Sequence, residues 1–423
     1  MTGDAAAKAI RKGDPGGSLL VIGEEAVAPY KRPPLSKGLW KGDDEAKLDL
    51  GTLTRGGDVL LGTRATGLDL ARRALTLADG TEVGYERLLL ATGARARELP
   101  GLPSGGPVVA FRHLADYRAA RARSGPGRVA AVVGGGFIGA ELAAALTQAG
   151  SRVHMIFPEA ELGANRFPSE LAGLVGATYR GRGVTLHPGT RVAAAKVTDA
   201  AATLTLDDGT TVRADLVVLG IGAVPNDELA RAAGLRVEDG IWVDEHLRAA
   251  RASEGGAVAD TTATSAGDPD RAAPPADGAY GGPDGAPLGV YAAGDVASFA
   301  FPGFARRARI EHEDNAYAMG AAAGRQMVAS VTGARAEPFA HLPFFYSDLF
   351  DDGYEAVGVL DARLAVVADW SEPGKSGVFY YLDGGTVRGV LLWNMWGLVD
   401  AARDLILAGV PVAPSELHGR LQG

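Results

Sequence analysis

A glycine-rich hexapeptide constrains the fold more than any other feature of this sequence. It reads Gly134-Gly135-Gly136-Phe137-Ile138-Gly139, directly after a β-prone run over 128–133 and at the start of a helical pattern over 137–149. A second β-prone run follows over 152–157. In such a turn Gly134 permits the tight bend, Gly136 the close approach of a pyrophosphate, and Gly139 the packing of helix against strand. The helix N-terminus supplies N–H donors for the phosphates. The pattern predicts a Rossmann-type unit that binds a dinucleotide.

An acidic residue follows the second strand of this unit. Glu159 lies 25 residues after Gly134, close to the spacing of about 20 expected for a carboxylate that binds the adenosine ribose. We therefore expect NAD(H), with NADP(H) disfavoured. The alternative is an exposed loop acid, and the neighbouring Arg152 and Arg166 keep NADP(H) open.

The N-terminus resembles a second unit of the same kind with its front removed. Gly3 stands where the third glycine belongs, followed by a helical run over 4–12, a β-prone run over 18–22 and the acid Glu24. The first strand of this domain and its first two glycines are missing, so we expect the start codon to lie further upstream. The alternative is a shortened protein that binds its first nucleotide weakly or not at all.

Strands alternate with helices along most of the chain, which predicts an α/β fold with parallel sheets. Residues 251–287 are mostly Ala, Gly, Asp, Pro, Ser and Thr, a composition typical of a disordered surface insertion. From about Glu337, aromatic strand-like runs and a closing helix over 398–408 indicate an α+β domain. The predicted domains are two Rossmann-like units and this C-terminal domain. They span 1–110 with 235–330 (FAD-binding), 111–234 (NAD(H)-binding) and 331–423.

Composition excludes several kinds of chemistry. The 423 residues contain no cysteine, so a disulfide, a thiolate zinc site, a Cys-ligated iron–sulfur cluster and a redox-active cysteine pair are all excluded. The net charge of −9 offers no electrostatic footprint for nucleic acid. The seven histidines show no metal-ligand spacing, so no metal is predicted. No signal peptide is visible, and the longest apolar run, 129–140, is shorter than the ~20 residues of a membrane helix. We expect a cytoplasmic protein.

Four further motifs, in order, carry a family resemblance. They are Pro29-Tyr30-Lys31-Arg32-Pro33-Pro34-Leu35-Ser36-Lys37, Leu90-Ala91-Thr92-Gly93, Gly220-Ile221-Gly222-Ala223-Val224-Pro225-Asn226 and Val290-Tyr291-Ala292-Ala293-Gly294-Asp295. They resemble the FAD-dependent pyridine nucleotide-disulfide oxidoreductases without the redox disulfide. Within that superfamily the flavin loop resembles ferredoxin and rubredoxin reductases and apoptosis-inducing factor. The likeness to apoptosis-inducing factor is favoured by residues 309–312, 346–349, 353–358 and 390–394, although Tyr346 stands where relatives often carry Trp.

The resemblance implies a set of cofactor contacts. Asp295 would accept hydrogen bonds from the FAD ribityl chain and Glu24 from its adenosine ribose, while Thr92 and Gly93 form the turn where the chain leaves the FAD domain. The other implied FAD contacts come from the same motifs: Gly3, Arg32, Pro33, Ala91, Gly222, Gly294 and Glu311.

The resemblance also implies a hydride-transfer site. Lys37 near the flavin would stabilise negative charge on the reduced ring, and Glu141, on the first turn of the NAD helix, would hold Lys37 and bind the nicotinamide amide. Phe137 would gate or stack on the flavin. His312 opens a helix near the flavin pyrimidine edge, where we expect it either to titrate near neutral pH or to be structural.

Two residues of the C-terminal domain, Tyr346 and Glu355, are implied nicotinamide contacts. For Lys37 and Glu141 an ordinary surface residue is the alternative. We interpret Trp393 and Trp396 as aromatic core.

The function that follows is an FAD-dependent NAD(P)H oxidoreductase. It passes a hydride from NADH to flavin and electrons to an acceptor such as a ferredoxin or rubredoxin, a small iron–sulfur carrier. The alternative is a redox-sensing interaction protein that turns over slowly and forms an NADH-linked homodimer. A third possibility is a chain that holds no FAD. The cluster Arg306, Arg307 and Arg309 suits an acidic partner, although an ordinary solvated face is favoured.

Overall fold

The computed structural model describes residues 1–252 and 289–422, so nearly all of the predicted insertion lies outside the described residues. The chain forms two compact units. The first comprises Met1–Lys31, Leu48–Ala94 and Pro225–Pro343, and the second comprises Arg32–Lys47, Arg95–Val224 and Phe344–Gly423. The chain crosses between units at strands β7 (Ala94–Ala96) and β16 (Ala223–Pro225), which pair with each other.

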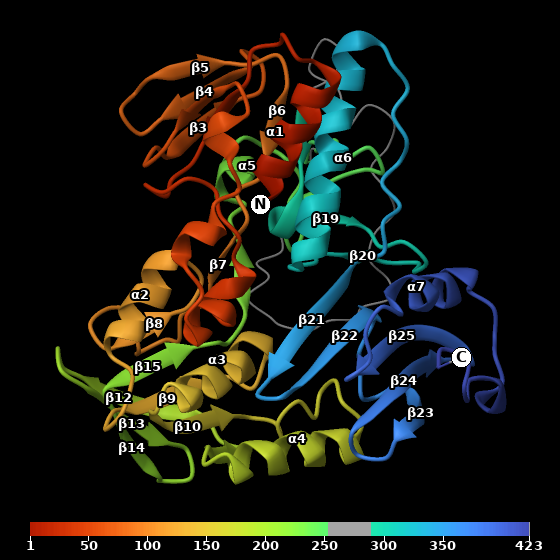
Figure 1. The fold of residues 1–423 in the computed structure, drawn as a ribbon. Coiled ribbons are helices and arrows are strands. Elements are labelled where there is room, and N and C mark those ends of the chain that lie inside the picture. The colour runs from red at the N-terminus through yellow and green to blue at the C-terminus, as the bar shows by residue number, and fades with distance from the viewer. Residues whose placement is uncertain (253–288, 423) are drawn as a thin grey trace. The chain divides into compact units, whose positions relative to one another are not determined.

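Two parallel helices form the packed centre of the first unit, α1 (Thr2–Gly13) and α6 (Glu313–Thr332) (Figure 1). They approach backbone to backbone because small residues line the contact. A Cβ added at Gly320 would lie 2.3 Å from the Thr2 carbonyl oxygen, and one at Gly324 would lie 2.5 Å from the Ala6 carbonyl oxygen. Only glycine fits at these two positions of α6.

The strands of the first unit form short sheets. Strand β1 (Leu20–Ile22) pairs in parallel with β2 (Asp58–Leu60), and β6 (Leu88–Leu90) pairs in parallel with β18 (Val290–Ala292). A third parallel pair, β17 (Ile241–Trp242) with β19 (Ala297–Ala300), belongs to a three-stranded sheet, so the parallel pairing is as predicted but is divided among three short sheets. The remaining elements are β3 (Ala65–Asp69), β4 (Ala74–Leu77), β5 (Glu82–Gly84), α5 (Glu228–Ala232), β20 (Arg307–Ala308) and the 3₁₀ helices η4 (Thr52–Thr54) and η5 (Gly294–Val296).

The second unit contains a five-stranded parallel sheet in the order β11-β10-β9-β15-β8. Its strands are β8 (Val108–Ala110), β9 (Val129–Val133), β10 (Arg152–Phe157), β11 (Thr185–Pro188) and β15 (Leu216–Leu219), and its helices are α2 (Leu114–Ala122), α3 (Phe137–Gln148) and α4 (Ser169–Gly181). All four residues of β15 are buried, as expected for a parallel strand covered on both faces. The antiparallel strands β12 (Val192–Val197), β13 (Ala202–Leu206) and β14 (Thr211–Ala214) pack hydrophobic side chains against this sheet. The predicted Rossmann-type unit is confirmed.

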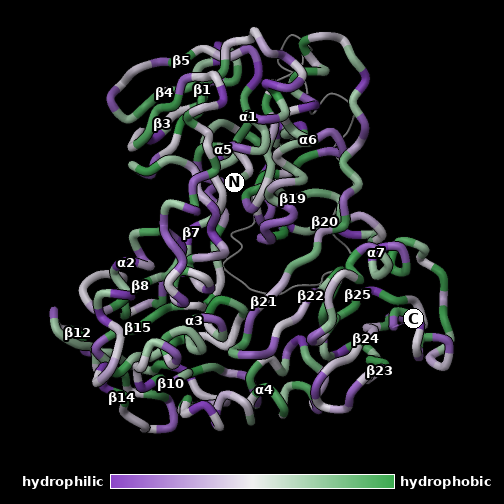
Figure 2. Tube along the Cα trace, viewed as in Figure 1, coloured by the Kyte–Doolittle hydropathy of each residue, from purple (hydrophilic) through white to green (hydrophobic). Residues whose placement is uncertain are grey.

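The second unit also contains an antiparallel sheet in the order β21-β22-β25-β24-β23, as the predicted α+β texture requires. Its elements are β21 (Phe344–Leu349), β22 (Asp352–Gly358), β23 (Ala365–Glu372), β24 (Ser376–Asp383), β25 (Thr386–Trp393) and helix α7 (Val399–Ala408). Hydrophobic residues along β24 and β25 appear as green segments in Figure 2 and are buried. Trp393 is core, as predicted, but the prediction for Trp396 is wrong because this side chain is 55% exposed.

The predicted Pro-rich flavin loop forms two 3₁₀ helices, η1 (Pro33–Leu35) and η2 (Gly38–Lys41), followed by η3 (Glu45–Leu48). A last 3₁₀ helix, η6 (Pro414–Glu416), lies near the C-terminus. None of the helices within residues 1–252 and 289–422 has the length and hydropathy that crossing a membrane requires.

Candidate functional site

The glycine turn of the second unit lies between β9 and α3. Gly134 has a φ of +113°, and a Cβ there would lie 2.4 Å from the Gly220 carbonyl oxygen. A Cβ at Gly139 would lie 2.1 Å from the Gly134 carbonyl oxygen, so these two glycines are required by packing. At Gly136 the nearest atom would be 3.6 Å away, and no side chain caps α3. The open side of the turn therefore fits a pyrophosphate at the helix N-terminus.

Glu159 follows β10 in the same unit. Its backbone is fixed by a hydrogen bond from the Gly189 N–H to its carbonyl oxygen, at 2.8 Å. Its Oε2 atom is buried and has no hydrogen-bond partner among the described residues. A buried acceptor without a donor is costly, so this carboxylate fits a ligand hydroxyl such as that of a ribose.

The two arginines that kept NADP(H) open lie differently. Arg152 is exposed, whereas Arg166 is buried and donates to the Gly135 carbonyl oxygen at 2.8 Å. Arg166 thus faces the glycine turn and not the solvent.

The structure brings Lys37 and Glu141 together. The Lys37 ammonium lies 2.6 Å from Glu141 Oε1, and the two side chains are 12% and 3% exposed. Ser347 donates to the same oxygen at 2.7 Å, and Ser36 donates to Oε2 at 2.6 Å. Sequence reasoning did not identify the two serines, although each adjoins a residue that it had singled out.

The position of Glu141 on its helix differs from the prediction. Glu141 is the fifth residue of α3, beyond the first turn. At this position its side chain is buried among the helix, the flavin loop and β21, and its charge is balanced by Lys37 and not by the helix N-terminus.

Tyr346 and Glu355 lie beside this pair. The Lys37 ammonium is 4.9 Å from the centre of the Tyr346 ring, and Tyr346 is paired with Glu355 across strands β21 and β22. Glu355 accepts a hydrogen bond from the Gly397 N–H at 3.3 Å, and partial burial raises the pKa of its carboxyl group. Four residues singled out in the sequence therefore gather in one cluster.

Phe137, the first residue of α3, is held between two groups. Its ring contacts Phe345 edge to face at 4.7 Å, and the Arg166 guanidinium lies 4.3 Å from the ring centre. The ring is half-buried, so one side of it remains accessible to a ligand.

In the first unit, the N-terminus of α1 meets the segment after β18. Gly294 has a φ of +76°, and a Cβ there would lie 2.3 Å from the Thr2 hydroxyl oxygen. A Cβ at Gly3, in contrast, would meet nothing within 4 Å. Asp295 follows Gly294 in η5. A close-packed turn with one open glycine fits a second pyrophosphate.

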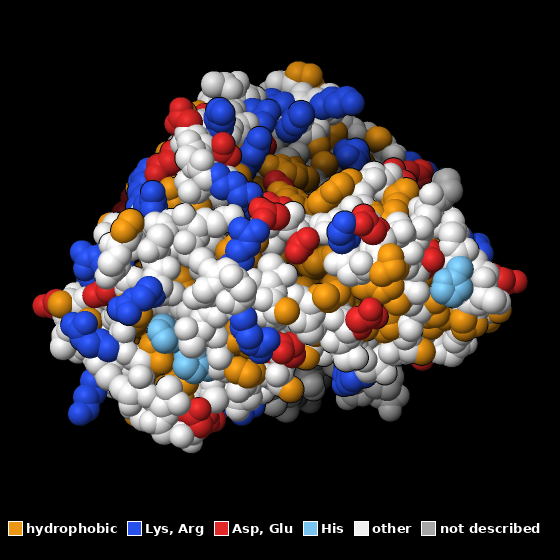
Figure 3. All heavy atoms as spheres, turned by 60° about the horizontal axis from the view of Figure 1, so that its bottom comes forward, with side chains coloured by type: hydrophobic (Ala, Val, Ile, Leu, Met, Phe, Trp, Pro, Cys, Tyr) orange, Lys and Arg blue, Asp and Glu red, His pale blue; other side chains and the backbone are white. Residues whose placement is uncertain are grey.

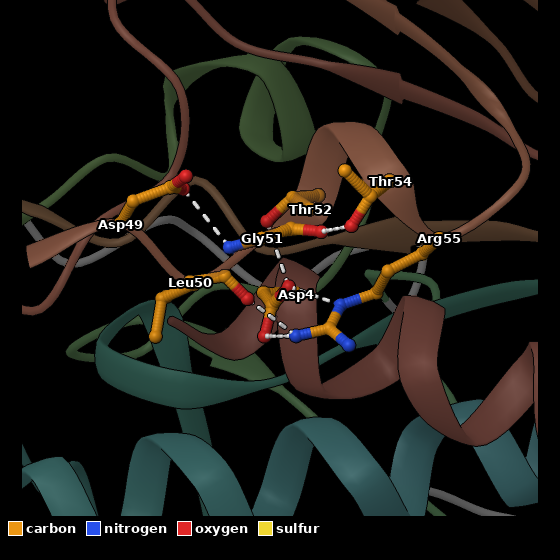
Figure 4. A network of polar contacts seen from close by, with 7 residues as sticks. All are labelled: Asp4, Asp49, Leu50, Gly51, Thr52, Thr54 and Arg55. Atoms are coloured by element: carbon orange, nitrogen blue, oxygen red, sulfur yellow. Dashed lines mark hydrogen bonds and ion pairs between the residues drawn. The ribbon is translucent and has the colours of Figure 1, made fainter.

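A buried network fixes the first turn of α1 (Figure 4). Asp4, which is 4% exposed, accepts two hydrogen bonds from the Arg55 guanidinium at 2.6 and 3.0 Å and one from the Thr52 hydroxyl at 2.7 Å. Arg55 also donates to the Leu50 carbonyl oxygen at 2.6 Å. The 50–55 loop is thereby attached to the helix end, an anchor that sequence reasoning did not identify.

His312 is the N-cap residue of α6, and of the two alternatives expected for it, titration near neutral pH is wrong. Burial lowers its pKa to about 4, against the opposing effect of the nearby Asp295 and Asp314 carboxylates. The imidazole is therefore neutral at pH 7. The preceding Glu311 is exposed and pairs with Arg309.

The expectation of a solvated arginine face is also wrong in part. Arg309 is only 10% exposed and lies 3.0 Å from Asp239. Arg307 lies 3.6 Å from the centre of the Trp242 ring and donates to the Val243 carbonyl oxygen at 2.5 Å. Both side chains therefore make contacts within the first unit and do not form a solvated face.

The remaining predicted FAD contacts are divided between the units. In the first, Glu24 is 70% exposed and lies 3.7 Å from Arg64, and the Thr92 hydroxyl donates to the Asn226 carbonyl oxygen at 2.7 Å. Gly93, next to Ala91 and Thr92, has a φ of +67° and accepts from the Asn226 N–H at 2.9 Å. In the second unit, Arg32 beside Pro33 donates to the Arg112 carbonyl oxygen at 2.9 Å, and Gly222 has a φ of +99°.

Comparison with known proteins assigns the family. Residues 1–254 match the model of the pyridine nucleotide-disulphide oxidoreductases. The chain belongs to this family. It is 33% identical over 422 residues to the ferredoxin–NAD(+) reductase component of the anthranilate 1,2-dioxygenase system of Burkholderia cepacia, covering 97% of this chain and 93% of that one.

Two other relatives show the same relationship. Apoptosis-inducing factor 1 of Dictyostelium discoideum is 28% identical over 445 residues, covering 96% of this chain and 77% of that one. Among solved structures, the covalent putidaredoxin reductase–putidaredoxin complex matches with a TM-score of 0.81 at 27% identity, covering 98% of this chain and 92% of that one. Family and fold therefore agree with the resemblance found in the sequence.

Proposed function

We propose that this protein is an FAD-dependent oxidoreductase that takes electrons from NADH and delivers them to a small iron–sulfur carrier protein. The observation that carries the proposal is the buried ion pair between Lys37 of the flavin loop and Glu141, which lies on the helix that follows the glycine turn. The ammonium group of a lysine fixed in this way would lie next to a dinucleotide site, and a positive charge there would tune a flavin for hydride chemistry.

The two nucleotides are assigned to different parts of the chain. The glycine turn and Glu159, within 111–234, would hold NADH, because they combine an open helix N-terminus with an unpartnered carboxylate oxygen. The N-terminus of α1 and Asp295, within 1–110 and 235–330, would hold FAD. FAD held there would supply the chemistry that links two-electron hydride transfer to one-electron delivery. Residues 331–423 would contribute the antiparallel sheet that carries Tyr346 and Glu355.

The chain's own residues hold and orient the reactants. Glu141, with three hydrogen-bond donors, fixes the Lys37 ammonium in one place, and Tyr346 covers that ammonium on another side. Glu355, whose pKa is raised, would bind the nicotinamide amide together with Glu141. His312, neutral at pH 7, would act as an uncharged hydrogen-bonding group and not as a cation.

The acceptor is inferred from the relatives. The Burkholderia relative is by name a ferredoxin reductase, and the matched solved structure holds putidaredoxin reductase together with putidaredoxin. On the face drawn in Figure 3, Lys and Arg side chains are interspersed with Asp and Glu. We further propose a cytoplasmic location, on the sequence grounds given above.

The test is anaerobic electron delivery. FAD-loaded protein is mixed with NADH and a panel of small [2Fe–2S] proteins, and reduction of the carrier is followed by absorbance. Turnover with at least one carrier supports the reductase. Reduction of the flavin without transfer to any carrier, together with NADH-dependent dimerisation in light scattering, would favour the redox-sensing alternative.

A further inference from the structure

Arg166 is a buried guanidinium without a counter-charge. It lies between β10 and α4 and is 8% exposed. Its Nη2 atom donates to the Gly135 carbonyl oxygen at 2.8 Å, while Nε is buried and has no partner among the described residues. No carboxylate in the described part of the chain forms an ion pair with it.

The surroundings fix this guanidinium but do not neutralise it. Its Cζ atom lies 4.3 Å from the centre of the Phe137 ring and 5.4 Å from that of Phe167. The Tyr381 hydroxyl donates to the Arg166 carbonyl oxygen at 2.7 Å, which holds the backbone. Aromatic faces attract a cation, but a buried charge is ordinarily paired with an opposite charge or a metal. A positive charge is therefore left uncompensated inside the second unit.

The location of this charge indicates what compensates it. Gly135 and Phe137, two of the residues that the Arg166 side chain contacts, belong to the glycine turn whose open side fits a pyrophosphate. Guanidinium is the side-chain group best matched to phosphate oxygens. We propose that Arg166 binds the pyrophosphate of NADH, so that the nucleotide supplies the missing negative charge. This inference rests on the proposed function, which places NADH at that turn.

In this assignment, two side chains recognise different parts of NADH. Glu159 would bind the adenosine ribose, where its buried oxygen lacks a donor, and Arg166 would bind the phosphates. It also means that Arg166 does not bind the 2′-phosphate of NADP(H), a role that the sequence had left open, because its side chain is hydrogen-bonded to the glycine turn. Loss of Arg166 should therefore weaken ligands with a pyrophosphate and leave ligands without one unaffected.

The test uses FAD-loaded protein and isothermal titration calorimetry with NAD⁺, ADP and adenosine, the last by competition with NAD⁺. In Arg166→Met the affinities for NAD⁺ and ADP are expected to fall at least tenfold, and that for adenosine less than twofold. Arg166→Lys, which retains the charge, should stay within about threefold of the wild type. The matched control is Arg182→Met in the same unit, because Arg182 also stacks on a phenylalanine, Phe350 at 5.5 Å, and pairs with Asp351. This variant should bind all three ligands normally.

Thermal unfolding separates binding from stability. Without nucleotide, Arg166→Met should unfold at the wild-type temperature or above it, because it removes an uncompensated buried charge, and ADP should raise that temperature less than in the wild type. Equal affinities for ADP in wild type and Arg166→Met would overturn the inference, as would an Arg166→Lys variant as weak as Arg166→Met. A wild-type protein that binds neither NAD⁺ nor ADP would instead refute the proposed function.

Discussion

The Lys37–Glu141 pair should make a large contribution to stability that depends on both partners. Glu141 is 3% exposed and Lys37 12%, and the ammonium–carboxylate distance is 2.6 Å. Replacing one member of a buried pair leaves the other charge without its partner, at a cost of about 3–5 kcal/mol. Replacing both removes that cost, so Lys37→Met/Glu141→Gln should be more stable than either single variant. The expected coupling free energy is at least about 3 kcal/mol, or more than a hundredfold in the ratio of folded to unfolded protein.

The assay is urea unfolding of the four proteins followed by tryptophan fluorescence. Four of the five tryptophans, Trp40, Trp370, Trp393 and Trp396, belong to the second unit, so the signal reports mainly on the unit that contains the pair. Midpoints at constant slope give the free energies of unfolding.

The control cycle uses the exposed pair of Arg118 and Glu45 in the same unit, which are 56% and 39% exposed. Its coupling should stay below about 1 kcal/mol. If the two single substitutions at Lys37 and Glu141 simply add in the double variant, the ion pair is not the buried, mutually dependent unit described here.

Three further predictions follow from single sites. Glu159→Ala should lower the affinity for NADH about tenfold, which corresponds to the loss of one or two hydrogen bonds, and should lower the affinity for NADPH less. Equal losses of affinity in titrations with both nucleotides would argue against a ribose contact. Gly324→Ala should cost about 1–3 kcal/mol by forcing α1 from α6, whereas Gly173→Ala, on an open face of α4, should be neutral or stabilising in thermal unfolding. The pKa of His312, about 4 against an ordinary 6.5, means that the unfolded chain binds a proton over that range and the folded protein does not. Stability should therefore fall by about 3 kcal/mol as pH drops from 6.5 to 4, and His312→Gln should lose that part of the pH dependence measured by urea unfolding.

Local sequence patterns predicted the regular elements of the second unit closely. Strand β10 coincides with the expected range residue for residue, and α3 begins at the predicted Phe137. These elements are defined by runs of apolar residues and by glycine turns, both of which act over a few neighbouring residues. The pairing of Lys37 with Glu141 came instead from the family resemblance, since 104 residues separate them.

What the sequence did not predict depends on tertiary burial. Ser36 and Ser347 bind Glu141 because three separate segments converge on one carboxylate, and no local pattern records that convergence. Whether His312 titrates near neutral pH or is structural stayed open in the sequence, because the pKa of an imidazole depends on how completely the fold excludes water from it. In the sequence Arg166 only keeps NADP(H) open, and the structure alone shows its guanidinium enclosed by two aromatic rings.

The central claim is that this chain passes electrons from NADH to a bound FAD, and anaerobic stopped-flow spectroscopy of the purified protein supplied with FAD tests it most directly. We predict that the protein shows the visible flavin bands and that NADH bleaches them faster than NADPH does. We also predict that Lys37→Ala, which removes the charge held by Glu141, slows the bleaching by NADH. A protein that retains no flavin, or flavin bands that persist when NADH is added, would contradict the account.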